Sequence, residues 1–168
     1  MSGAIDVTTV SGISSFVTRE VEPLSEKKYS VDSPPGKIEK RVFIGGRYIL
    51  MPILREIEKV VRSLGFQPII PRDFDMPRES TRDDTIRLLY QCRYFIFEVT
   101  LGDGHSIEIV RTSNLQDKRE LYVFMTQDKR REQPPETVSL MIKQGTSLRG
   151  YLTIDELRNL VADFLRTP

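Results

Sequence analysis

The chain has 168 residues, of which 39% are hydrophobic and 29% are charged, a balance typical of one soluble globular domain. Its net charge of +1 gives no argument for bulk nucleic-acid binding, and no apolar run approaches the roughly 20 residues of a membrane span. The single cysteine, Cys92, excludes an intrachain disulfide and fits the cytoplasmic location that we expect.

The first 39 residues differ in composition from the rest. They are rich in Ser, Thr, Val and Gly and end in the sequence Ser-Pro-Pro-Gly at 33–36, so we interpret 1–39 as an extension and linker and 40–168 as the domain. No basic segment precedes an apolar core, so we expect no secretory signal. Apolar residues at 10, 13, 17 and 21 have helical spacing, but Gly12 and the β-branched residues favour a loosely docked tail equally well.

From residue 40 onward, apolar runs typical of buried strands alternate with helical patterns. We predict strands at 41–45, 66–70, 94–99, 121–125 and 148–152. Helices are predicted at 49–64, from a Ser80–Asp83 or Thr81–Asp84 capping box through residue 90, at 107–115, at 136–144 and at 154–165. In the second of these helices we expect Ile86, Leu89 and Tyr90 to point inward. Gly65 is expected to end the first helix, and Thr153 with Glu156 to cap the last.

Strict alternation of strands and helices predicts an α/β fold with a parallel sheet and helices on both faces. Five strands suit a flavodoxin-like three-layer sandwich with strand order 2-1-3-4-5, in which the first and third strands are neighbours. Ligands of such sheets bind at the carboxyl ends of the strands, where the order reverses. We therefore expect the site in the crevice between the loops at 45–48 and 101–106.

The loop after the first strand offers four candidate substrate-binding residues. Gly45 and Gly46 allow a close approach of the backbone to a ligand, and the following helix start favours a phosphate or a sugar hydroxyl. Arg47 is suited to pair with a phosphate and Tyr48 to stack on a base or bond a sugar. The alternatives are that the glycines only make a tight turn, that Arg47 is solvated and that the Tyr48 ring is partly buried. The sequence has neither a G-x-G-x-x-G motif nor a P-loop lysine, so neither a Rossmann site nor a P-loop site is indicated.

The loop after the third strand supplies the chemistry. Glu108 lies in the first turns of the predicted helix, where an ionised carboxylate is suited to act as a nucleophile or to stabilise an oxocarbenium-like sugar. Glu98, a carboxylate inside an apolar strand, needs solvent or a partner such as Arg47. His105 is placed to donate a hydrogen bond to a ligand. His105 and Glu108 together provide too few ligands for a metal ion, and we expect neither a metal nor a cofactor. The alternative for Glu108 is a first-turn glutamate that only interacts favourably with the helix dipole, and the alternative for His105 is a loop histidine without a function.

The loop at 71–79 carries prolines and many charges and lies beside the same crevice. These charges predict a lid or a base-recognition loop, and the alternative is a solvated surface loop. The charged residues are Arg72, Asp73, Asp75, Arg78 and, just beyond the loop, Arg82.

Two segments carry a resemblance. The sequence VFIGGRY at 42–48 resembles the first strand and loop of nucleoside 2-deoxyribosyltransferases, and GHSIEI at 104–109 resembles that family's glycine turn, in which a glycine precedes the nucleophilic glutamate by four residues. The related Toll/interleukin-receptor-like domains also place a glutamate after the third strand and cleave NAD at its glycosidic bond. The resemblance implies that Glu108 is the nucleophile or the ribose-facing carboxylate. It also implies that Tyr48 and the Gly45–Gly46 backbone line the sugar or phosphate pocket. Gly104, His105 and Ser106 of the glycine turn are further candidate substrate-binding residues.

The sequence thus leads to two hypotheses of different classes. The first is an enzyme that hydrolyses or transfers the N-glycosidic bond of a nucleoside, a deoxynucleotide or NAD. The second is a non-catalytic nucleotide-binding or self-association module of the same fold, favoured by His105 and Ser106 standing where the transferases have Thr and a small residue. A receiver or an FMN protein is a weaker third reading, because the acidic cluster and the phosphate loop are missing. The resemblance also implies a homo-oligomer, since active sites in the family are often completed across an interface.

Overall fold

The computed structural model describes residues 29–101, 108, 111–112, 115, 117–126 and 147–168. Most of the helix expected at 107–115 and the whole helix expected at 136–144 lie outside these residues, although Glu108, Arg111 and Thr112 are helical. None of the described helices is long and apolar enough to cross a membrane.

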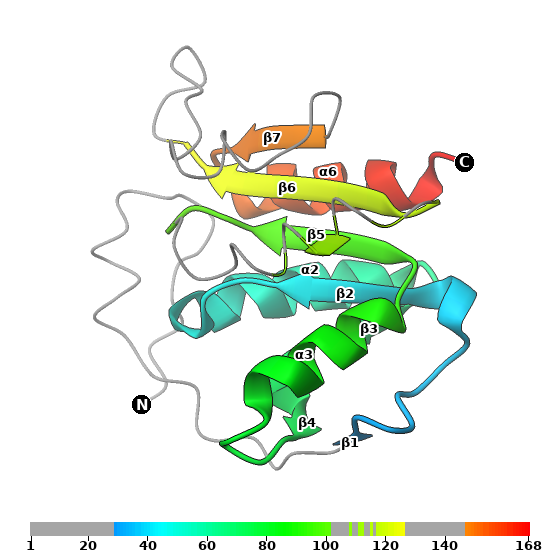
Figure 1. The fold of residues 1–168 in the computed structure, drawn as a ribbon. Helices are drawn as coiled ribbons and strands as arrows, with labels where there is room; N and C mark the ends of the chain where they lie inside the picture. The colour runs from blue at the N-terminus through cyan, green and yellow to red at the C-terminus, as the bar shows by residue number, and fades with distance from the viewer. Residues whose placement is uncertain (1–28, 102–107, 109–110, 113–114, 116, 127–146) are drawn as a thin grey trace, which may run out of the picture.

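A five-stranded parallel sheet forms the centre of the domain (Figure 1). Its strands, in spatial order, are β3 (Gln67–Ile69), β2 (Arg41–Gly45), β5 (Tyr94–Glu98), β6 (Arg119–Met125) and β7 (Ser147–Tyr151). Gly45 of β2 pairs in register with Phe97 of β5, so these two strands end side by side. The α/β class and the parallel sheet predicted from the sequence are therefore present.

The structure adds two short strands that the sequence analysis did not predict. β1 (Tyr29–Ser30) pairs in parallel with β4 (Phe74–Asp75) in a separate two-stranded sheet. Because β1 and β4 are counted in the strand numbering, the order of the main sheet is β3-β2-β5-β6-β7 instead of the predicted 2-1-3-4-5. The change comes from the two added strands rather than from different neighbours among the five.

Side chains that alternate along the strands form two hydrophobic cores, one on each face of the sheet. Val42 and Ile44 of β2 point to the face covered by α2 (Met51–Ser63) and α6 (Ile154–Arg166). Phe43 of β2 and Phe95 of β5 point to the opposite face, which α3 (Thr81–Tyr90) covers. This period of two is what a strand buried on both faces requires.

The ends of α2 and α6 follow from local sequence signals. Gly65 adopts a φ of 78° just after the α2 C-cap residue, Leu64, which is the conformation a glycine stop supplies. At α6, the Thr153 side chain accepts a hydrogen bond from the Glu156 amide at 3.2 Å, and the Glu156 carboxylate accepts one from the Leu152 amide at 2.8 Å. Both signals were predicted correctly.

Helix α3 differs from its prediction in its cap and in its buried face. The Ser80 side chain donates to the Asp84 carboxylate at 2.7 Å instead of capping the helix, so no capping box forms. Leu88 and Leu89 are buried, whereas Tyr90, which we expected to point inward, is 44% exposed.

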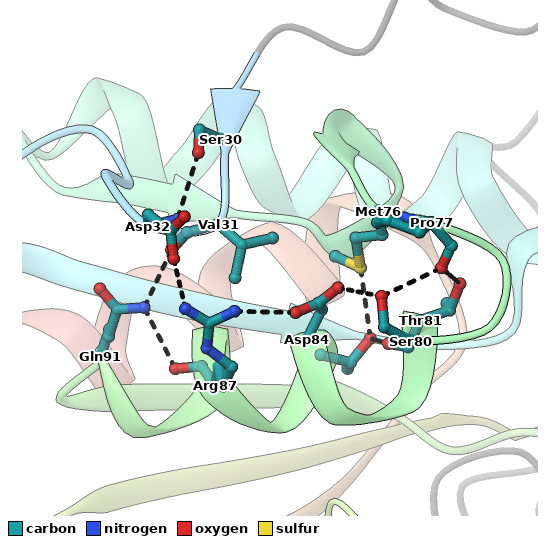
Figure 2. A network of polar contacts seen from close by, with 11 residues as sticks. Ser30, Val31, Asp32, Met76, Pro77, Ser80, Thr81, Asp84, Arg87 and Gln91 are labelled. Carbon is teal, nitrogen blue, oxygen red and sulfur yellow. Dashed lines mark hydrogen bonds and ion pairs between the residues drawn. The ribbon is translucent and has the colours of Figure 1, made fainter.

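Residues 29–39, here called the N-terminal strap, pack against the domain although we assigned them to a linker. The Val31 side chain is buried in the same core as α3, and the Val31 carbonyl accepts a hydrogen bond from the side-chain amide of Gln91 at 3.1 Å. The Arg41 guanidinium donates to the carbonyls of residues 34, 35 and 36 at 2.7 to 3.0 Å. Asp32 pairs with Arg87 of α3 (Figure 2).

Candidate functional site

A cavity of about 490 Å³ opens at the carboxyl end of β2. Its walls come from three segments: the end of β2 with the loop that follows, the segment from Pro71 to α3, and Glu108. The lining residues are Phe43, Ile44, Gly45, Gly46, Arg47, Tyr48, Pro71, Arg78, Glu79, Thr81, Arg82, Thr85 and Glu108. The size suits a small organic ligand, and the place is the one predicted for a parallel sheet.

Gly45 and Gly46 belong to the first wall, and packing alone requires both to be glycine. A Cβ atom on Gly45 would lie 2.6 Å from the Phe97 ring, and one on Gly46 would lie 2.6 Å from Leu54 Cδ2. These distances are too short for carbon atoms. The two glycines therefore let the loop cross close to β5 and α2, and this crossing positions Arg47 and Tyr48 at the cavity.

Tyr48 begins a short 3₁₀ turn, η2 (Tyr48–Leu50), that leads into α2. Its ring is 47% exposed, and the Arg72 guanidinium carbon lies 5.5 Å from the ring centroid. Burial raises the pKa of the Tyr48 hydroxyl; the positive charge of Arg72 opposes this rise and the negative charge of Glu108 adds to it. Tyr48 and Glu108 thus share one electrostatic environment, although 60 residues separate them in sequence.

Hydrogen bonds within the second wall fix its backbone, as Figure 2 shows. The Pro77 carbonyl accepts from the Ser80 amide at 3.1 Å and from the Thr81 hydroxyl at 3.0 Å. The Thr85 hydroxyl donates to the Thr81 carbonyl at 2.7 Å, and Asp84 joins Ser80 to Arg87. The hydroxyl of Ser80 and the guanidinium of Arg87 lower the pKa of Asp84, so this carboxylate is ionised at neutral pH.

Charged side chains gather around the cavity. Arg47, Arg78 and Arg82 carry positive charge, and Glu79 and Glu108 carry negative charge. Within the described part of the chain, none of these five side chains forms an ion pair or hydrogen bond with another residue. Other charged groups nearby are paired: Arg55 donates two 2.7 Å hydrogen bonds to Asp73.

Glu98 lies outside the cavity lining. Its carboxyl group is buried and accepts hydrogen bonds from the Tyr151 hydroxyl at 3.0 Å, from the Thr100 amide at 3.3 Å and from the Thr100 hydroxyl. Burial raises the pKa of Glu98 to about 7, although these hydrogen bonds oppose the rise. The arginine partner that we considered, Arg47, is not among its contacts.

The structure thus brings five of the nine predicted site residues to one cavity: Gly45, Gly46, Arg47, Tyr48 and Glu108. Gly104, His105 and Ser106 lie outside the described residues. The sequence analysis pointed to Arg78 and Arg82 through the charged loop, but it did not single out Glu79, Thr81 or Thr85. A polar helix start directly after a proline-rich loop was the available signal for these three.

Among the described residues, no group of three or more His, Cys, Asp or Glu side chains is arranged to hold a metal ion. Comparisons of the chain with protein-family models and with curated proteins find no match. The cavity itself is therefore the feature from which a function can be proposed.

Proposed function

We propose that the chain is an N-glycosidic-bond hydrolase or transferase with a flavodoxin-like three-layer fold. Its substrate is a nucleoside, a deoxynucleotide or NAD, and Glu108 is the carboxylate that acts at C1′. The observation that carries this proposal is the convergence of Glu108 with Gly45–Tyr48 on one cavity. These are the segments whose sequences resemble the nucleoside 2-deoxyribosyltransferases.

The proposed chemistry has two steps. A Glu108 oxygen forms a bond to C1′ while the C1′–N bond breaks, and the base leaves with that electron pair. The base of a nucleoside or deoxynucleotide then takes up a proton, whereas the nicotinamide of NAD leaves neutral without one. Water, or a second base in a transferase, then attacks C1′ and releases the Glu108 carboxylate. Tyr48 is placed beside this carboxylate to contact the sugar, and burial keeps its hydroxyl protonated and able to donate.

A chromatographic assay for the free base tests the proposal. The protein is incubated separately with NAD, deoxynucleosides and deoxynucleoside monophosphates, and Glu108→Gln is measured in parallel. We expect the wild type to release base and Glu108→Gln to lose at least about 10²-fold of the rate. Glu39→Gln is the matched control, because Glu39 is exposed in η1 (Ile38–Lys40), outside the cavity. Loss of activity in Glu79→Gln but not in Glu108→Gln would refute the assignment to Glu108.

A non-catalytic nucleotide-binding or self-association module is the second candidate. Tyr48, which lines the cavity, and its neighbour Ile49 are exposed by 47% and 45% and favour contact with a partner or a second copy. No base release from folded wild-type protein, together with a concentration-dependent dimer in sedimentation, would favour this function over the first. A homo-oligomer belongs to both proposals.

A further inference from the structure

Three arginines of the cavity have unused hydrogen-bonding capacity. Within the described part of the chain, the side chains of Arg47, Arg78 and Arg82 make no hydrogen bond or ion pair, either with the cavity carboxylates Glu79 and Glu108 or with any other residue. Arginines of the neighbouring framework behave differently: Arg87 pairs with both Asp32 and Asp84. The positive charge of the cavity is therefore available to a ligand.

The backbone that carries Arg78 and Arg82 is held in place without the help of their side chains. Ser80 and Thr81, which lie between them, donate to the Pro77 carbonyl (Figure 2). The Thr85 hydroxyl donates to the Thr81 carbonyl. The backbone is therefore already ordered, and only the exposed Arg78 and Arg82 side chains remain to be ordered around an anion.

The start of α3 lies on the same side of the cavity. Ser80 directs its hydroxyl to Asp84 instead of capping the helix, so the first turn has no side-chain cap. Its N–H groups add a partial positive charge where Thr81 and Arg82 line the cavity. Guanidinium groups and a helix start favour the same ligand chemistry, a phosphate ester.

We infer that the cavity has an anion subsite, formed by Arg78, Arg82 and the start of α3 with Arg47 at its edge, that selects a phosphorylated nucleotide over a neutral nucleoside. This inference rests on the proposed function only for the sugar, which lies toward Tyr48 and Glu108. The phosphate lies at the α3 end. The ligand is either a nucleoside monophosphate or the pyrophosphate of a dinucleotide, and both present the same chemistry to the arginines.

The subsite is tested by binding, separately from turnover. Calorimetric titration of Glu108→Gln protein compares a deoxynucleoside, its 5′-monophosphate, NAD and inorganic phosphate. We expect the monophosphate or NAD to bind at least tenfold more tightly than the deoxynucleoside, and the stronger of the two identifies the source of the phosphate. In the Arg78→Gln/Arg82→Gln variant this preference falls by about 10- to 100-fold, because hydrogen bonds to charged groups are lost. Arg166→Gln, at the exposed end of α6, is the matched control.

Two results would overturn the inference: equal affinity for the nucleoside and its monophosphate, or a preference that survives in the double variant. Circular dichroism of both variants checks that each is folded. The inference and the proposed function fail in different ways. Tight, arginine-dependent phosphate binding without base release would refute only the proposed enzymatic function. Rapid base release from neutral nucleosides, with no gain from a phosphate, would refute only the anion subsite.

Discussion

Replacing the buried Glu98 by glutamine is expected to remove a pH dependence from the stability of the fold. The Glu98 carboxyl is only 1% exposed, and its three hydrogen-bond donors are the Thr100 amide, the Thr100 hydroxyl and the Tyr151 hydroxyl. It forms no ion pair with a described residue. Burial therefore favours the protonated form and raises the pKa of Glu98 to about 7.

The sign of the effect follows from proton binding in the two states. The folded protein keeps the Glu98 proton up to a pH of about 7, whereas the unfolded chain releases it near the ordinary pKa of 4.5. Between these values the unfolded state binds fewer protons, so the free energy of unfolding falls as the pH rises and levels off above 7. The two pKa values correspond to about 3 kcal/mol in total, of which about 2–3 kcal/mol is lost between pH 5 and pH 8.

Urea unfolding of the wild type and of Glu98→Gln at pH 5, 6, 7 and 8 measures this difference. The variant keeps a neutral side chain at every pH, so its free energy of unfolding should gain about 2–3 kcal/mol relative to the wild type between pH 5 and pH 8. A changed hydrogen bond shifts the comparison by about 1 kcal/mol at all four pH values equally. Glu39→Gln, with an exposed carboxylate, should show no such gain. A wild-type-to-variant difference that stays constant with pH would refute the reasoning.

Three further predictions concern the framework around the cavity. Gly46→Ala should lower the free energy of unfolding by about 1–3 kcal/mol in urea unfolding, because its Cβ would meet Leu54 Cδ2 at 2.6 Å; an unchanged value would contradict the close crossing. Cys92 should resist thiol reagents at pH 8 until guanidinium unfolds the protein, because burial raises the pKa of its thiol to about 12; rapid labelling of the native protein would refute this. Removal of residues 1–39 should lower the free energy of unfolding, measured by heat or urea, by about 3 kcal/mol more than removal of 1–28, because Val31 leaves the core and the Arg41 guanidinium loses three acceptors. Equal stability of the two shortened chains would show that the N-terminal strap does not stabilise the domain.

The part of the fold that depends on local pattern could be predicted from the sequence. Apolar runs identified the five strands of the main sheet, Gly65 identified the end of α2, and Thr153 identified the cap of α6. These signals are strong because each depends on residues a few positions apart.

The remaining features depend on contacts between distant segments. The pairing of β1 with β4 joins residues more than 40 positions apart through two short strands that have no apolar periodicity of their own. Ser80 was expected to cap α3, but Asp84 competes for its hydroxyl, and Arg87 and Asp32 hold Asp84 in place. For Glu98 the sequence predicted solvent or an arginine as the partner, and only Tyr151, 53 residues later, makes its burial understandable. The sequence also predicted a site at the carboxyl end of β2, but not which residues of the charged loop line the cavity there.

The edge of the main sheet at β3 limits how copies of this protein can associate. An uncovered edge strand invites another chain to extend the sheet, but β3 has only three residues, and Pro68 in its middle has no N–H to donate. The strap also closes over this edge, since a Cβ on Gly36 would lie 2.8 Å from the Gln67 side chain. Continuous sheet formation through β3 is therefore disfavoured. At this edge a dimer would instead associate through side chains, and one formed by the exposed Tyr48 and its neighbour Ile49 would bury one wall of the cavity between the copies.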